Sequence, residues 1–189
     1  IVAPYLLRYG NQALKKKYLP KMAAGEQIAA IAMSEPGAGS DLQSVKTSAI
    51  RKGDTYVLNG SKTFITNGWH ADLVILVAKT DPAAGAKGTS LFLIERGMPG
   101  FEKGKRLKKL GLKAQDTSEL FFDNVKVSAD QLLGGPAMEG KGFICLMEQL
   151  PWERLQIAIS AVAAAQAAID WTIEYTQDRQ VFGKAVANY

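Results

Sequence analysis

The sequence contains very little cysteine and histidine, the residues on which most metal sites and disulfide frameworks depend. Among its 189 residues there is one cysteine, Cys145, and one histidine, His70. A single cysteine excludes an internal disulfide framework, so we expect a reducing compartment such as a bacterial cytoplasm or a mitochondrial matrix. His70 follows an Asn-Gly turn, and we interpret it as a loop residue rather than a catalyst. We assign no metal-binding residue.

Long apolar runs are also missing. The longest, residues 157–169, is mostly alanine and is interrupted by Ser160 and Gln166, so we expect no transmembrane segment. The hydrophobic share of 47% is nevertheless enough to bury a core, which indicates one or two soluble, globular domains. The chain begins at Ile1 rather than at a methionine, and both ends look cut from a longer protein.

Acidic residues are fewer than lysines and arginines, and the net charge is +5. The excess comes partly from three consecutive lysines at residues 15–17 and from a basic cluster at residues 103–113. This cluster has no interleaved aromatic residues and lies in no recognisable nucleic-acid-binding module. We therefore expect no nucleic-acid partner and interpret the cluster as a solvated face or a surface for small anions.

Short strands dominate the middle of the chain. Residues 11–24, which open with the favourable N-cap residue Asn11, predict a helix. From residue 27 onward, apolar or β-branched runs separated by turn residues predict strands. Lys-Gly-Asp at residues 52–54 and Asn-Gly-Ser at residues 59–61 lie at hairpin spacing and predict turns. The strands are expected at residues 28–33, 45–51, 55–58, 62–65, 73–79, 90–95 and 119–127.

These runs have no long helices between them, so they predict an antiparallel meander. Residues 152–179, with helical spacing and few breakers, predict one long helix, whose alanine-rich middle needs packing partners. The fold class is therefore α+β, with an antiparallel β-sandwich or barrel as a middle domain flanked by helical segments. We assign residues 1–27 to the end of one helical domain, 28–135 to the β-domain and 136–189 to the start of another helical domain.

Two segments carry the residue types of a ligand site. Ser-Glu-Pro-Gly-Ala-Gly-Ser-Asp at residues 34–41 follows a predicted strand, and its glycines would let backbone amides approach a ligand closely. It is not a P-loop or a dinucleotide fingerprint, because neither Gly-Lys-Ser/Thr nor a helix follows. At residues 59–68, alternation places Phe64 and Thr66 on one strand face, where they could stack on and hydrogen-bond to a planar heterocycle. An ordinary turn and a half-buried strand are the alternatives.

Together these two segments resemble the acyl-CoA dehydrogenase family in their residue sequences and in their order along the chain. The middle domain of that family typically shows Thr/Ser-Glu-Pro-Gly-Ala-Gly-Ser-Asp, followed by Asn-Gly-x-Lys-x-Trp/Phe-Ile-Thr-Asn-Gly. The resemblance continues through Asp-Thr-Ser-Glu-Leu-Phe-Phe-Asp-Asn-Val at residues 116–125 and ends in Asp-Arg-Gln-Val-Phe-Gly-Lys at residues 178–184. It covers essentially the whole chain and implies a fragment of the acyl-CoA dehydrogenase fold.

The resemblance implies FAD as the cofactor and an acyl-CoA as the substrate. Phe64 stands where tryptophan is commoner in the family, which keeps a stacking face but loses an indole donor. The residues implied to line the isoalloxazine are Ile31, Met33, Ser34, Phe64 and Thr66.

Three further positions match binding residues of the family. Ser40 matches a position that touches the pantetheine-phosphate part of coenzyme A. Arg179 and Phe182 match residues that reach the FAD of a neighbouring subunit, which implies a dimer or tetramer of the full-length protein. The rigid fork of arginine suits a pyrophosphate. Taken alone, Arg179 would be a cation at the carboxyl end of a helix.

The implied reaction is α,β-dehydrogenation of an acyl-CoA thioester in fatty acid β-oxidation, with electrons passed to an electron-transfer flavoprotein. A carboxylate must remove the α-proton. A subset of the family, including long-chain and isovaleryl-type enzymes, carries this base early on the long helix, just before an arginine. Residues 150–155 read Leu-Pro-Trp-Glu-Arg-Leu, so Glu153 is the candidate base and Arg154 a neighbour that positions it or the substrate. A first-turn acidic residue that favours the helix dipole is the alternative.

Other interpretations remain open at this point. Most family members take the base from a later part of the chain, and Glu153 would then have another role. Acyl-CoA oxidases and related flavin monooxygenases share much of this scaffold. The 189-residue piece could also be a folded, non-catalytic domain that binds little FAD without the rest of the site.

Overall fold

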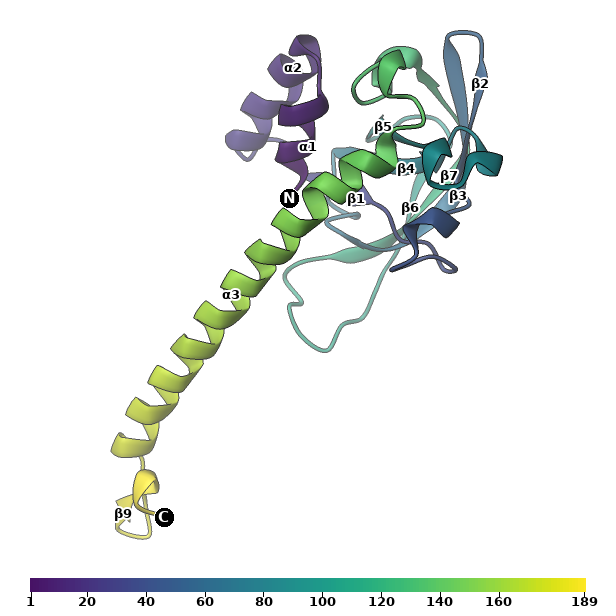
Figure 1. Ribbon diagram of the computed structural model, residues 1–189. Coiled ribbons are helices and arrows are strands. Elements are labelled where there is room, and N and C mark those ends of the chain that lie inside the picture. Colours follow the sequence, from purple (N-terminus) through teal and green to yellow (C-terminus); the bar gives the residue numbers. More distant parts are fainter. The chain divides into compact units, whose positions relative to one another are not determined.

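The computed structural model describes residues 1–189, which form two compact units, Ile1–Met147 and Glu148–Tyr189 (Figure 1). The first unit holds two helices and a seven-stranded sheet, and the second holds most of a long helix and a small hairpin. The elements are α1 (Val2–Tyr9), α2 (Gln12–Ala23), β1 (Ala29–Ala32), β2 (Ser48–Lys52), β3 (Thr55–Thr66), β4 (Leu73–Lys79), β5 (Thr89–Glu95), β6 (Phe101–Arg106), β7 (Thr117–Ser128), α3 (Gly142–Asp178), β8 (Gln180–Val181) and β9 (Lys184–Ala185). Short 3₁₀ helices lie at Leu42–Ser44, Pro82–Gly88, Ala129–Gln131, Pro136–Met138 and Val186–Asn188.

Helix α2 confirms the helix predicted at residues 11–24. The Asn11 side chain accepts a hydrogen bond of 2.9 Å from the Leu14 amide, as an N-cap residue does. The Tyr18 hydroxyl donates to Glu95 Oε1 at 2.6 Å and joins α2 to the end of β5. Helix α1 lies within residues 1–27, which were assigned to a helical domain, but no separate helix was predicted at its residues; one of its faces is buried.

The strands form a curled, half-barrel sheet in the order β1-β4-β2-β3-β7-β6, with β5 paired to β4. The predicted α+β class is confirmed. Four of the six strand pairings are antiparallel, but β1 and β2 both run parallel to β4, so the chain does not form the predicted simple meander. Strand β4 is buried along its whole length, so both faces of the sheet are covered at this strand.

Strands β1 and β2 share one edge of β4. β1 pairs with residues 73–76 of β4, and β2 meets it where Ser48 lies opposite Lys79. The segment between them, residues 33–47, therefore leaves the sheet and returns to it along a single edge. This topology sets the position of the predicted ligand loop.

Strand β3 runs unbroken through residues 59–61, so the turn predicted there is wrong. Gly60 has a φ of 151°, and the register with β7 shifts just before it, which indicates a bulge. A Cβ at Gly60 would lie 2.5 Å from Thr47 Oγ1, so the glycine is needed for close packing and not for a hairpin. The hairpin predicted at residues 52–54 is confirmed, because Lys52 pairs with Thr55.

Two other elements differ from the sequence predictions. Strand β6 overlaps the start of the basic cluster and pairs with β7 from Phe101 opposite Phe122 onward. Its charged residues suit a strand at the edge of a sheet, and they concealed it in the sequence. Helix α3 starts at Gly142, ten residues before the predicted start, and includes Pro151.

Helix α3 is the one helix that meets a length-and-composition criterion for crossing a bilayer. The expectation of no transmembrane segment rested on the shorter run at residues 157–169, whereas α3 is 37 residues long. A single helix of this kind is weak evidence for a membrane span, because core helices of soluble proteins meet the same criterion.

Candidate flavin site

The predicted ligand loop, residues 34–41, folds into a tight turn beside β3. The Glu35 amide donates to the Ala38 carbonyl at 2.8 Å, and the Ala38 amide donates to the Glu35 carbonyl at 3.1 Å. The Thr63 amide donates to the Ser34 carbonyl at 3.0 Å, so the end of β1 lies beside the second half of β3. Ser34 is half-buried and Ser40 is exposed.

A buried ion pair holds this loop. Lys62 Nζ lies 2.8 Å from Glu35 Oε1 and donates to the Met33 carbonyl at 2.9 Å. The Glu35 carboxylate also accepts the amides of Lys46 at 2.6 Å and Thr47 at 2.9 Å. Burial lowers the pKa of Lys62 to about 8, against the opposing effect of Glu35. Burial acts to raise the pKa of Glu35, but its hydrogen bonds outweigh this effect and lower it.

Phe64 and Thr66 are exposed on β3, and Ile65 between them is buried, as the predicted alternation requires. Phe64 is 68% exposed and has a φ of 59°, a left-handed value that is strained for an aromatic residue. Internal packing does not require an exposed ring, so this strain points to a ligand-facing role. The hydrogen bond from the Thr63 amide to the Ser34 carbonyl brings the Ser34 loop next to Phe64. Ile31, which is half-buried, lies on β1 just before this loop. An aromatic face and hydroxyl groups are the kinds of group that can stack on and hydrogen-bond to a planar heterocycle.

Asp116, the first residue of the motif at residues 116–125, was not predicted as a site residue, but it holds the turn that follows β3. Its Oδ2 accepts the Trp69 amide at 2.8 Å, and its carbonyl accepts the Asn67 amide at 3.1 Å. His70 lies in this turn with Nε2 4.0 Å from Asp116 Oδ1, and its side chain is 55% exposed. The interpretation of His70 as a loop residue is confirmed.

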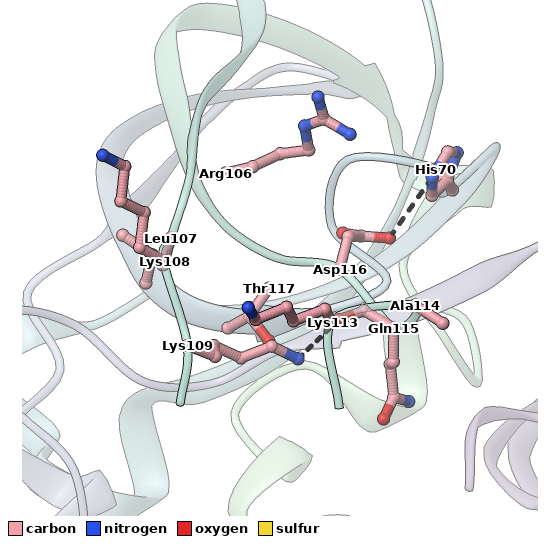
Figure 2. A pocket seen from close by; sticks show the side chains of 10 residues that line it. All are labelled: His70, Arg106, Leu107, Lys108, Lys109, Lys113, Ala114, Gln115, Asp116 and Thr117. Carbon is pink, nitrogen blue, oxygen red and sulfur yellow. Dashed lines mark hydrogen bonds and ion pairs between the residues drawn. The ribbon is translucent and has the colours of Figure 1, made fainter. Parts of the chain in front are cut away.

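The basic cluster lines a cavity of about 490 Å³ at the β6–β7 loop (Figure 2). The Arg106 guanidinium lies 5.4 Å from the centroid of the Trp69 ring, and Lys109 Nζ donates to the Gln115 carbonyl. Four cations and one carboxylate line this cavity, which suits water or an anion rather than an apolar ligand. The lining residues are His70, Arg106, Leu107, Lys108, Lys109, Lys113, Ala114, Gln115, Asp116 and Thr117.

The candidate base and its neighbour lie on α3, in the second unit. Glu153 follows the helix start at Gly142 by roughly three turns. Because the helix-dipole effect is confined to the first turn, the dipole interpretation of Glu153 is wrong. Arg154 is exposed.

The carboxyl end of α3 carries the other two predicted residues. Arg179 directly follows the helix and lines a cavity of about 490 Å³ together with Trp171, Glu174, Tyr175 and Asp178. Phe182 is 94% exposed at the tip of the β8–β9 hairpin and has a φ of 49°. This second exposed aromatic residue with left-handed backbone is displayed by a two-residue turn, since Val181 pairs with Lys184.

Two family models match this chain. Acyl-CoA dehydrogenase, middle domain, matches residues 30–125, and Acyl-CoA dehydrogenase, C-terminal domain, matches residues 140–189. The chain belongs to the acyl-CoA dehydrogenase family. Acyl-CoA dehydrogenases are FAD-dependent, and Phe64 lies within the matched middle domain.

Individual acyl-CoA dehydrogenases are similar over nearly all of this chain. Mitochondrial long-chain specific acyl-CoA dehydrogenase of Mus musculus is 54% identical over 100% of the chain and 44% of its own length. Mitochondrial isovaleryl-CoA dehydrogenase of Pongo abelii is 47% identical over 97% of the chain and 43% of its own length. The crystal structure of acyl-CoA dehydrogenase from Geobacillus kaustophilus superposes with a TM-score of 0.94, at 52% identity, over 100% of this chain and 50% of that one. The chain thus spans about half the length of these relatives.

Proposed function

We propose that the full-length protein containing this chain is an FAD-dependent acyl-CoA dehydrogenase that desaturates an acyl-CoA thioester between its α and β carbons. Electrons would then pass to an electron-transfer flavoprotein. The observation that carries the proposal is the exposed, strained Phe64 ring beside the Ser34 loop, in a family that uses FAD. The mitochondrial relatives and the bacterial structure support a mitochondrial matrix or bacterial cytoplasm as the compartment.

The first unit would hold the isoalloxazine. The Phe64 ring offers a stacking face, and the hydroxyls of Ser34 and Thr66 address the polar edge of the ring system. Ile31 and Met33, at the end of β1, supply apolar contact. When bound, FAD supplies the acceptor for the hydrogen that leaves the β-carbon as hydride.

The remaining assignments rest on family motifs. Glu153 would remove the α-proton on its carboxylate, with Arg154 positioning it or the substrate. Ser40 would bind the pantetheine-phosphate part of coenzyme A, and Arg179 and Phe182 would reach the FAD of a neighbouring subunit in a dimer or tetramer. The match of residues 140–189 to the helical C-terminal domain supports helices, rather than a bilayer, as packing partners of α3.

The test is anaerobic titration of the FAD-loaded, full-length protein with acyl-CoAs of different chain length and branching. We expect bleaching of the visible flavin band, followed by recovery when oxidised electron-transfer flavoprotein is added. Bleaching followed by faster recovery with dioxygen would favour an oxidase. A full-length protein that binds no FAD would contradict the proposal.

A further inference from the structure

Lys62 is a buried cation directly beside the residues proposed to face the flavin. It is 1% exposed on β3, two residues before Phe64. Its amine crosses from β3 to the end of β1, where it donates to the Met33 carbonyl at 2.9 Å. One side chain thus connects the two strand segments of the site.

Glu35 extends this connection to a third segment. It pairs with Lys62 at 2.8 Å and accepts the amides of Lys46 and Thr47, which immediately precede β2. Its own backbone closes the turn with Ala38. The ion pair therefore anchors both ends of the loop that leaves and re-enters the sheet.

Stability does not explain why charges are used here. Removing two charges from water is costly, and a buried ion pair is often no more stabilising than apolar residues of the same volume. What the pair supplies is geometry, because each of its hydrogen bonds fixes a backbone group of the loop. The Ser34 carbonyl and the Thr63 amide, 3.0 Å apart, lie next to the residues that the pair holds.

We propose that Lys62 and Glu35 are positioning residues of the flavin site, which hold Met33 and Ser34 at a fixed distance from Phe64 and Thr66. This inference rests on the proposed function. The pair does not touch the reacting atoms; it acts through the backbone that presents the flavin-facing residues.

The experiment compares Lys62→Met, Glu35→Gln and the double variant in the full-length protein. Urea denaturation reports stability, and titration of the apoprotein with FAD, followed by flavin fluorescence, reports affinity. We expect Lys62→Met to be the least stable, because it leaves the Glu35 charge buried alone. The double variant should recover most of the wild-type stability yet bind FAD about tenfold or more weakly, because the loop has lost its anchors.

Two comparisons keep the outcome decisive if Lys62→Met fails to fold. Glu35→Gln keeps the side-chain volume and an acceptor oxygen, so it should fold and show a smaller loss of FAD affinity. Tyr56→Phe, which removes a buried hydroxyl bonded to Glu139 at 2.8 Å near the other end of β3, should leave FAD affinity unchanged. Wild-type FAD affinity in both the double variant and Glu35→Gln would overturn the positioning role. Absence of FAD binding by the wild type would overturn the proposed function itself.

Discussion

The Trp69 amide donates a hydrogen bond of 2.8 Å to Asp116 Oδ2, across 47 positions of the sequence. Asp116 is buried, and its carbonyl also accepts the Asn67 amide. These contacts join the turn after β3 to the residue just before β7. They determine where β3 ends and therefore how Thr66, its last residue, is presented.

Asp116→Ala should lower the free energy of unfolding by about 1–3 kcal/mol, because the partly buried Trp69 amide loses its acceptor. Asp116→Asn keeps an acceptor oxygen and should lose less. Urea denaturation of the full-length protein measures both. The exposed Asp130 is a suitable control, and Asp130→Ala should stay within about 0.5 kcal/mol of wild type. Equal losses from Asp116→Ala and Asp130→Ala would refute the role of the turn contact.

Gly60→Ala should destabilise the protein by about 1–3 kcal/mol, because its Cβ would overlap Thr47 and its φ of 151° is unfavourable for alanine. Gly111→Ala is the matched control, since no atom lies within 4 Å of a Cβ at that position. Thermal unfolding of the two variants should separate them clearly. A stable Gly60→Ala protein would mean that β3 and the segment before β2 are not so closely packed.

The sequence predicted much of the sheet because its strands are short apolar runs bounded by turn residues. The prediction of strands and turns failed where a tertiary contact overrides a local sequence signal. Asn59-Gly60 has the chemistry of a hairpin, yet Gly60 continues a strand because Thr47 packs against it. Strand β6 was missed because it is charged, and it pairs with β7 at the sheet edge.

The candidate site was likewise predicted only in part. The alternation of residues 64–66 predicted which side chains are exposed, but nothing local indicated the left-handed backbone of Phe64. The ion pair of Glu35 with Lys62 joins residues 27 positions apart. Each of these residues is ordinarily solvated, so no local pattern marks them as buried partners.

The free energy of unfolding should rise between about pH 8 and pH 10.5 because of Lys62. Its pKa is about 8 in the fold and near 10.5 in the unfolded chain, so the unfolded chain binds more protons over this range. The rise should be on the order of 2–3 kcal/mol and absent from Lys62→Met. Urea midpoints of both proteins across this range provide the measurement.

Tyr56→Phe tests a pKa shift in the opposite direction, which makes the free energy of unfolding fall as the pH rises. Burial and the Glu139 carboxylate raise the pKa of Tyr56 to about 12, so its contribution to stability is present below pH 10 and lost as the pH approaches 12. The phenylalanine variant should lack this fall in the free energy of unfolding and keep the rise that comes from Lys62.

For the Lys62 prediction, parallel profiles of unfolding free energy against pH in Lys62→Met and wild type would show that the lowered pKa of Lys62 is wrong.

Phe64→Ala should weaken FAD binding by about tenfold while changing the free energy of unfolding by less than about 0.5 kcal/mol, because the ring is 68% exposed. Phe64→Trp keeps the stacking face and should bind FAD at least as well as wild type. Phe121, an exposed aromatic residue on the adjacent β7, provides the control. If Phe121→Ala weakened FAD binding as much as Phe64→Ala, the effect would not be specific to the proposed stacking face.

Glu153→Gln in the full-length protein should slow flavin bleaching by an acyl-CoA by about 10²–10⁴-fold, because the amide cannot accept the α-proton. FAD affinity should remain at the wild-type value, since Glu153 is not proposed to hold the cofactor. Glu148→Gln removes a charge from the same helix and serves as the control, with bleaching expected at the wild-type rate. Stopped-flow absorbance under anaerobic conditions measures all three proteins. Undiminished bleaching by Glu153→Gln would place the base in another part of the protein, whereas equal slowing in both variants would indicate a general effect of charge on α3.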